Sequence, residues 1–271
     1  MTKPILLRFS QIVISVAIFG FMVWYAASGD HLWKAWIVTM ILLIFFCGAI
    51  GQWLMDCPWG ILVTSFNLMS LSRIQLVAWT IVVLSGYFVI LMARIGHGLP
   101  PLNALDVNIP NNLWAVLGIS TASFTVVPIV LDSKTRNTVD PQAIRTASLV
   151  LKEDAGAIQQ NAKGKVYANS KPSDARFSDL FQGDEIGNTA YVDISKLQLF
   201  LLTLFVIVAY CHLLGTAMLA NVSPKDFASL PDFSPGELKL LGLSHAGYLT
   251  FKAVNHTPDT STRTQSEILP N

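Results

Sequence analysis

Charged residues are scarce in this chain of 271 residues, in which Asp, Glu, Lys and Arg together make up 13%. Soluble domains commonly carry about a quarter of their residues as charged side chains. Apolar residues reach 52%, and the mean hydropathy is +0.52. Few charges and long apolar runs argue against a large soluble core and indicate an integral membrane protein. The formal net charge of +1 provides no overall attraction to nucleic acid, so no nucleic-acid partner is predicted.

Cysteine and catalytic motifs are also missing. The chain has 3 cysteines, Cys47, Cys57 and Cys211, without a CxxC pair or the spacing of a Cys/His metal site. They are expected to act as small apolar side chains. Neither HExxH, GxSxG, a Walker loop nor a dinucleotide fingerprint occurs. We therefore predict no enzymatic activity, no bound cofactor and no metal site.

Six apolar segments are expected to form membrane-spanning helices, each of which needs about 20 mostly apolar residues. The segments are 9–27, 35–55, 74–95, 113–131, 197–220 and 236–254. The first is interpreted as an uncleaved helix and not as a signal peptide. Two are weaker: 113–131 is rich in small and hydroxyl residues, and 236–254 carries several charges.

Parts of the second half repeat parts of the first. Ser72–Gln75 reappears as Ser195–Gln198 at an offset of 123, and 117–122 reappears as 241–246 at an offset of 124. The repeat predicts two tandem helical-hairpin modules, and it supports 236–254 as a span because that segment aligns with 113–131. The modules are expected to be parallel, because an even number of crossings separates their starts.

The expected fold class is all-α: a six-span membrane protein with two tandem modules and a small cytoplasmic insertion. Its parts are an N-terminal two-helix segment, 1–58; a first module, 59–131; an insertion, 132–192; a second module, 193–256; and a polar tail, 257–271. Six crossings place both termini on one side. That side holds most of the Lys and Arg, so both termini are predicted to be cytoplasmic.

Polar residues inside predicted helices are candidates for function, because they are costly in a membrane. His212 and His245 suit a proton relay, a metal or haem ligand, or a pore lining; the alternative is a plain hydrogen bond between helices. The repeat favours the plain bond, since His212 aligns with Val89 and His245 with Thr121. The predicted pore or polar network comprises His212, His245, Ser120, Ser244 and Thr121.

Small residues recur four apart on two helices, as Gly118 and Ala122 and as Gly242 and Ala246. This spacing lets helix backbones approach closely, either within one chain or at the contact between subunits of an oligomer. The basic corners at Arg73 and Lys196 are expected to anchor at the membrane surface; the alternatives are binding lipid head groups or holding the insertion.

One apolar face of the insertion, made of Phe177, Leu180 and Phe181, has two interpretations. It docks a partner, or it packs against the membrane end of the same chain. The stretch Asp-Leu-Phe-Gln-Gly-Asp-Glu at 179–185, with Leu-Gly-Leu-Ser-His-Ala-Gly-Tyr-Leu at 241–249, resembles uncharacterised bacterial multi-pass membrane proteins. The resemblance implies a bacterial inner-membrane protein and supplies no activity, cofactor or site.

Three classes of function stay open. The first is a non-enzymatic subunit that anchors or scaffolds a larger assembly, with membrane lipid and either further copies or other subunits as partners. The second is a channel or pore lined by Ser, Thr and His. The third is a membrane redox or enzyme subunit that uses His212 and His245. Low intramembrane charge and the packing motifs favour the first.

Overall fold

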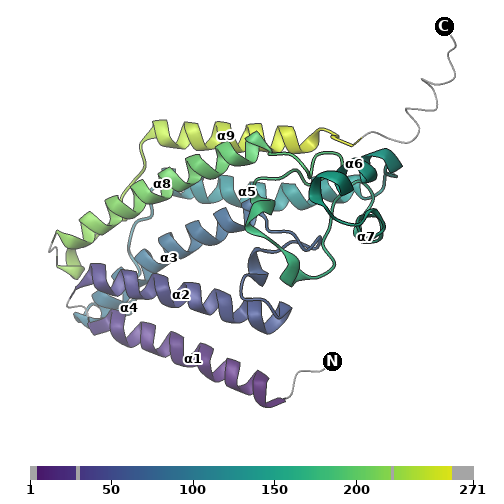
Figure 1. Cartoon of the computed structure of the whole chain (residues 1–271). Helices are drawn as coiled ribbons and strands as arrows, with labels where there is room; N and C mark the ends of the chain where they lie inside the picture. The colour runs from purple at the N-terminus through teal and green to yellow at the C-terminus, as the bar shows by residue number, and fades with distance from the viewer. Residues whose placement is uncertain (1–4, 29–30, 221–222, 258–271) are drawn as a thin grey trace, which may run out of the picture. The chain divides into compact units, whose positions relative to one another are not determined.

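The computed structural model describes residues 5–28, 31–220 and 223–257, with side chains from residue 13 onward. The polar tail expected at 257–271 lies outside this description apart from Thr257. Within the described ranges the chain is all-helical, as predicted, and has only isolated β-bridges (Figure 1). The long helices are α1 Ile5–Ser28, α2 Leu32–Met55, α3 Leu71–Gly96, α5 Asn111–Lys134, α8 Ile194–Leu219 and α9 Pro235–Ala253.

Short helices occupy the connections. They are α4 Pro101–Ala104, α6 Pro141–Leu151 and α7 Ala155–Asn161, with 3-10 turns η1 Gly60–Leu62, η2 Pro172–Asp174, η3 Phe177–Leu180 and η4 Pro224–Asp226. Side-chain capping explains where two of these helices begin. Asp140 caps α6 by accepting from the backbone N–H of Gln142, and Asp154 caps α7 by accepting from that of Ala157.

Four helices are long and apolar enough to cross a membrane: α2, α3, α5 and α8. These four indicate a membrane protein. Within the described residues, the helices of the other two expected spans are not both long and apolar enough to cross a membrane. For α1, side chains are described only over the apolar stretch Val13–Ser28, and α9 carries Glu237, Lys239 and Lys252 over 19 residues.

The chain divides into two compact units, and α3, α5, α8 and α9 contribute a segment to each. Unit 1 comprises Met1–Ile61, Gln75–Gly118 and Thr203–Leu240. Unit 2 comprises Leu62–Ile74, Ile119–Leu202 and Leu241–Asn271. The expected insertion 132–192 thus belongs to the same unit as one end of each of these helices.

Unit 1 contains α1 lying alongside α2 (Figure 1). Gly96 allows a close approach between helix ends, because a Cβ atom there would lie 2.0 Å from the carbonyl oxygen of Ala27. The two connecting loops of this unit also meet. The N–H of Asn108 donates to the Ala228 carbonyl at 2.9 Å, and the N–H of Leu230 donates to the Asn108 carbonyl at 3.0 Å.

An aromatic cluster forms the buried centre of unit 1. The Trp79 ring lies 6.0 Å from that of Tyr210 and 5.6 Å from that of Phe233, and the latter two rings stack at 4.8 Å. One turn before Trp79, the side-chain amide of Gln75 donates to the Thr203 hydroxyl at 2.5 Å. Aromatic burial with an edge-to-face contact stabilises the approach of α3 to α8 here.

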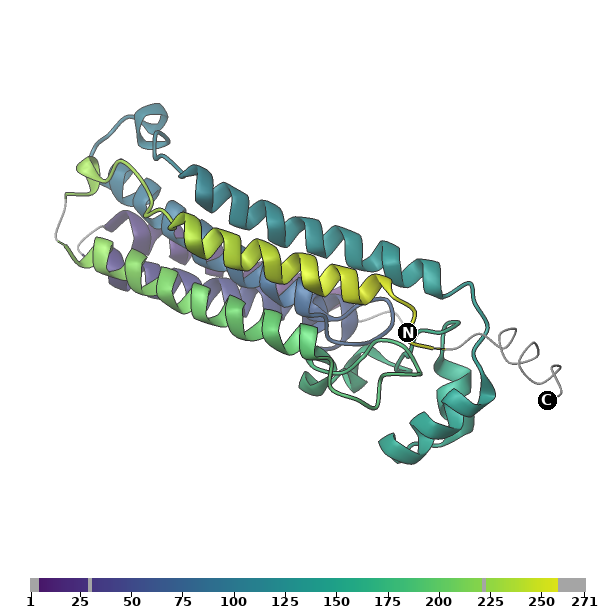
Figure 2. The ribbon, with the colours of Figure 1, turned by 90° about the horizontal axis from the view of Figure 1, so that it is seen from above.

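Unit 2 is built around a core shared by the insertion and the helix ends. Its buried residues include Phe66 before α3, Leu131 on α5, Leu199 on α8 and Tyr248 on α9, together with Leu180 from the insertion. The small helices α6 and α7 lie beside each other near the Lys134 end of α5 (Figure 2). Among the described residues, the insertion therefore shares its buried core with the ends of α5, α8 and α9.

Candidate functional site: a buried carboxylate–lysine cluster

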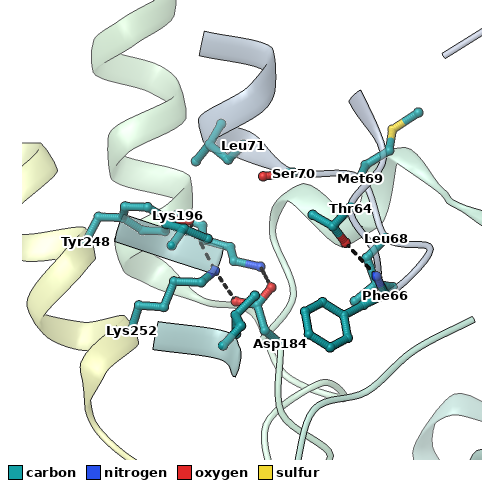
Figure 3. Close-up of a pocket in the computed structure, with 12 residues that line it drawn as sticks. Thr64, Phe66, Leu68, Met69, Ser70, Leu71, Asp184, Lys196, Tyr248 and Lys252 are labelled. Atoms are coloured by element: carbon teal, nitrogen blue, oxygen red, sulfur yellow. Dashed lines mark hydrogen bonds and ion pairs between the residues drawn. The ribbon is translucent and has the colours of Figure 1, made fainter. Parts of the chain in front are cut away.

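Two adjacent carboxylates form the centre of unit 2. Asp184 and Glu185 follow Gly183 in the segment between η3 and α8. Oδ1 of Asp184 lies 3.0 Å from Nζ of Lys196, and Oδ2 pairs with Nζ of Lys252. Figure 3 shows both lysine side chains converging on this one carboxylate, with Tyr248 beside them. The Lys252 ammonium also lies 3.1 Å from the Tyr248 hydroxyl.

Glu185 binds a third lysine and the chain after α9. Its Oε1 lies 2.6 Å from Nζ of Lys134, and its Oε2 accepts the backbone N–H groups of His256 at 3.0 Å and Thr257 at 2.9 Å. One carboxylate thus connects the end of α5 to the segment that follows α9. Hydrogen bonds to an ionised acceptor are among the stronger ones in proteins.

The three lysines come from the ends of three helices. Lys134 is the last residue of α5, Lys196 is the third of α8 and Lys252 is the second to last of α9. Lys134 also donates to the carbonyls of Lys252 and Val254, both at 2.6 Å, and so satisfies acceptors that the end of α9 leaves without a helical donor. Lys196 donates to the Gln182 carbonyl, which lies in the segment after η3, at 2.5 Å.

The charged side chains of this cluster are largely buried, and each depends on the others to neutralise its charge. Glu185 is 1% exposed, Lys134 and Lys196 are each 3% exposed, and the Asp184 side chain is 17% exposed. Burial alone raises the pKa of Asp184, but Lys196 and Lys252 outweigh burial and hold that pKa well below its ordinary value. Transferring such charges out of water is costly, so removal of one member leaves an unpaired buried charge.

The space around the cluster is too small for an organic substrate. A cavity of about 10 Å³ lies beside Asp184 and Tyr248, and another of about 10 Å³ lies beside Glu185 and Asn188. Each has room for roughly one water molecule, whereas drug-sized ligands occupy about 300–1,000 Å³. Across the described residues, no group of three or more His, Cys, Asp or Glu is placed to hold a metal. The arrangement is suited to holding chain segments together.

Part of the predicted polar network is assembled between α5 and α9. Nδ1 of His245 lies 2.6 Å from the hydroxyl oxygen of Ser123, a residue that the sequence interpretation did not include. Ser120 and Ser244 are also buried, and their hydroxyls, like Nε2 of His245, have no hydrogen-bond partner among the described atoms.

The other two members of that network do not join it. Thr121 and His212 are exposed on α5 and α8. The repeat pairs Thr121 with His245 in sequence, yet His245 faces inward and Thr121 faces outward.

The small residues face outward in the single chain. Gly118, Ala122 and Ala246 are exposed, and a Cβ atom on Gly118 would have no described neighbour within 4 Å. Gly242 is half-buried, and a Cβ atom there would lie 3.7 Å from Ile119. The interior side of α5 carries Ser120 instead. Close helix packing within the chain does not use Gly118, and a subunit contact stays a prediction.

The three apolar residues of the insertion are placed differently from one another. Leu180 is fully buried in the core of unit 2, so it is not available to a separate partner. Phe181 packs edge-on against Phe200 of α8, with ring centroids 5.1 Å apart. Phe177 also contacts Phe200 but is 60% exposed. Of the three, Phe177 is the one that presents an apolar surface.

Sequence reasoning missed the carboxylate–lysine cluster. A signal was present: Lys134, Lys196 and Lys252 each lie at an end of an apolar segment, and two adjacent acidic residues lie between them in the chain. Their pairing needed the fold. No protein-family model, curated protein or solved structure matches the chain.

Proposed function

We propose that this chain is a non-enzymatic bacterial inner-membrane subunit that anchors or scaffolds a larger, oligomeric assembly. The observation that carries the proposal is the carboxylate–lysine cluster. It links Asp184 and Glu185 of the segment 132–192 to lysines at the ends of α5, α8 and α9, and of these five charged side chains Asp184 is the only one that is not fully buried. A rigidly held extramembrane segment beside cavities of water size suits presentation of a surface to other proteins.

The proposed topology has six spans with both termini cytoplasmic. Helix bounds support the tandem modules: α8 begins and ends 123 positions after α3 (194 − 71 and 219 − 96), and α9 begins 124 positions after α5 (235 − 111). The charges of α9 lie near its ends. Glu237 forms a capping box with Ser234, and Lys252 pairs with Asp184, which makes α9 acceptable as a span.

Reporter fusions test this topology. A reporter after Asn137 and one after Thr260 should both report the cytoplasm, and one at Asn103 should report the opposite side. Opposite sides for the Asn137 and Thr260 fusions would show that α9 does not cross.

Two exposed surfaces support partners. Phe177 is an exposed aromatic residue on the tied segment, and the exposed small face of Gly118 and Ala122 suits a helix of another copy. The test is the size and composition of the protein extracted from its native membrane with surrounding lipid. We expect a species that contains more than one chain, and Phe177→Ser should lower the amount of that species. Leu149→Ser is the matched control, since Leu149 is 80% exposed on α6 of the same segment. A single chain without partners would contradict the proposal.

The buried contact between Ser123 and His245 favours a second candidate function, a path for protons or small polar solutes. Three buried polar atoms, on Ser120, Ser244 and His245, have no hydrogen-bond partner among the described residues, and water in this region would satisfy them. Flux measured in liposomes that contain the purified chain tests this candidate. Flux that disappears in His245→Leu and persists in His212→Leu would replace the scaffold proposal.

A further inference from the structure

The inner faces of α5 and α9 change from hydroxyl to charged residues as the helices approach the carboxylate–lysine cluster. Buried residues recur along each face at the spacing of one side of a helix: Ser120, Ser123, Val127, Leu131 and Lys134 on α5, and Ser244, His245, Tyr248 and Lys252 on α9. Ser123 contacts His245, and further along Lys134 donates to the Lys252 carbonyl at 2.6 Å. The two faces therefore lie against each other between these contacts.

Two serines on these faces differ from other hydroxyl residues of the same helices. Thr125 and Ser133 on α5 and Thr250 on α9 donate to carbonyls of their own helix, at 2.7–2.9 Å. Ser120 and Ser244 are 0% and 6% exposed, and their hydroxyls have no hydrogen-bond partner among the described residues. A buried hydroxyl without a partner is costly, so these two positions need an explanation.

A third buried polar atom lies at the same level. His245 is 2% exposed, and its Nε2 has no partner within the part of the chain that the structure describes. Its Nδ1 lies 2.6 Å from the Ser123 hydroxyl oxygen. Ser120 precedes Ser123 by about one helical turn, and Ser244 directly precedes His245. Groups of buried polar atoms like this one are commonly satisfied by ordered water, which both donates and accepts.

A cavity of water size lies about one turn from these atoms, on the side of the cluster. Its volume is about 10 Å³, and it is lined by Val127, four positions after Ser123, and by Tyr248, three positions after His245. Asp184 lines the same cavity, and its side chain is 17% exposed (Figure 3). The cavity thus lies between a partly exposed carboxylate and the buried polar atoms.

We propose that water enters unit 2 beside Asp184, crosses this cavity and binds at the three unpartnered polar atoms. Beyond His245 in the other direction, the inner face of α9 continues with Leu241, which is apolar and fully buried, so the polar approach is from the cluster. Bound water gives the imidazole a partner for proton exchange, which a proton relay requires. The route deepens the second candidate function and rests on it for its role, because both use the contact between α5 and α9.

Water contact of the histidines tests the route in the full chain, reconstituted in lipid bilayers with isotope-labelled histidine. Magnetisation transfer from water to each imidazole is measured by solid-state NMR, and the signals are assigned by replacing each histidine with glutamine in turn. We expect rapid transfer to His245 and slow transfer to His212, which is exposed on the membrane-spanning helix α8. Transfer to His245 that is no faster than transfer to His212 would overturn the route.

Two matched substitutions on α5 test the entrance. Val127→Ile adds a methyl group to the lining of the cavity, so the transfer to His245 should be lost. Val126→Ile adds the same group at the neighbouring position, where the side chain is 36% exposed, and the transfer should be retained. Unchanged transfer in Val127→Ile would show that water does not use this cavity and would refute the route.

Melting temperatures give an independent test of bound water. If water binds at Ser120 and Ser244, then Ser120→Ala and Ser244→Ala each remove a hydrogen bond and should lower the melting temperature. If the hydroxyls are dry, each change removes an unsatisfied buried group and should raise the melting temperature, which would refute the site. Ser133→Ala is the matched control, because the exposed Ser133 donates to the Val130 carbonyl at 2.7 Å, and it should have little effect.

Proton flux in liposomes, measured on the same variants, separates the route from the second candidate function. Water contact at His245 without flux would support the route and contradict the candidate function. Flux that occurs without water contact at His245 would overturn the route and leave the candidate function in place.

Discussion

The carboxylate of Asp184 lies 3.0 Å from the ammonium group of Lys196. The sequence did not predict this pair, although holding the insertion was one alternative for the basic corner at Lys196. Lys252 reaches the same carboxylate from α9. This relationship fixes where the insertion meets the helices. It also gives the Asp-Leu-Phe-Gln-Gly-Asp-Glu stretch a physical role, because its last two residues bind lysines from three helices.

Asp184→Asn should destabilise the folded chain by about 3–5 kcal/mol, because Lys196 and Lys252 lose their shared counter-charge while they stay buried. Thermal or denaturant unfolding in detergent measures the change. Asp132→Asn is the matched control: the Asp132 side chain is 71% exposed and pairs with Arg136 at 3.5 Å. The control should change stability by less than about 1 kcal/mol. Similar losses in both variants would contradict a special role for the buried cluster.

Stability should depend on pH through Asp184. Its pKa is lowered in the folded state, so the ionised carboxylate stabilises the fold at every pH above its unfolded pKa of about 3.9. That contribution is lost as the pH falls through the folded pKa. Asp179 acts in the opposite direction, because burial raises its pKa.

The measurement is the difference in melting temperature between wild type and Asp184→Asn from pH 7 to pH 3. The difference should stay constant down to about pH 4 and then narrow, because protonation removes the charge that the variant lacks. A difference that widens on acidification would have the wrong sign for this cluster.

Gly118→Leu should leave the stability of the single chain nearly unchanged, because the added side chain meets open space. If the small-residue face is a subunit contact, the same change should shift the assembly to a smaller species. Gly96→Ala is the contrasting change, since its Cβ atom would lie 2.0 Å from the Ala27 carbonyl oxygen. It should cost about 1–3 kcal/mol by overpacking. Detergent-resistant size and melting temperature separate the two effects, and a destabilised Gly118→Leu monomer would show that the face is internal.

His245→Leu should cost about 1–3 kcal/mol, because it leaves the buried Ser123 hydroxyl without its partner. His212→Gln should change stability by less than about 0.5 kcal/mol, since His212 is exposed. Unfolding curves of both variants give the comparison. The ranking fails if His212→Gln is the more destabilised variant or loses a bound chromophore.

Composition and apolar run length determined that the chain is all-helical and membrane-like, because both properties depend on local hydrophobicity. The helices α3 and α8 have the same length and are offset by 123 positions, the offset at which the Ser-basic-x-Gln motif recurs, and the tandem modules stay a prediction. The sequence pattern does not show which face of a helix points into the protein and which points outward. Sequence spacing shows that Gly118 and Ala122 share a face, but it does not show that Ser120 occupies the interior and the small residues the surface.

Only the tertiary structure decided the site. Lys134 and Lys252 lie 51 and 67 positions from Glu185 (185 − 134 and 252 − 185), and Lys196 lies 11 positions after it. Each of these residues alone has the appearance of an ordinary charge at a helix end or in a polar loop. Their pairing depends on three helix ends and one turn meeting at a single point. A buried charge is stable only where an opposite charge arrives from elsewhere, so the partners exist only after the helices have packed. The same packing distinguishes Lys196, which is buried against Asp184, from its repeat counterpart Arg73, which lines a cavity.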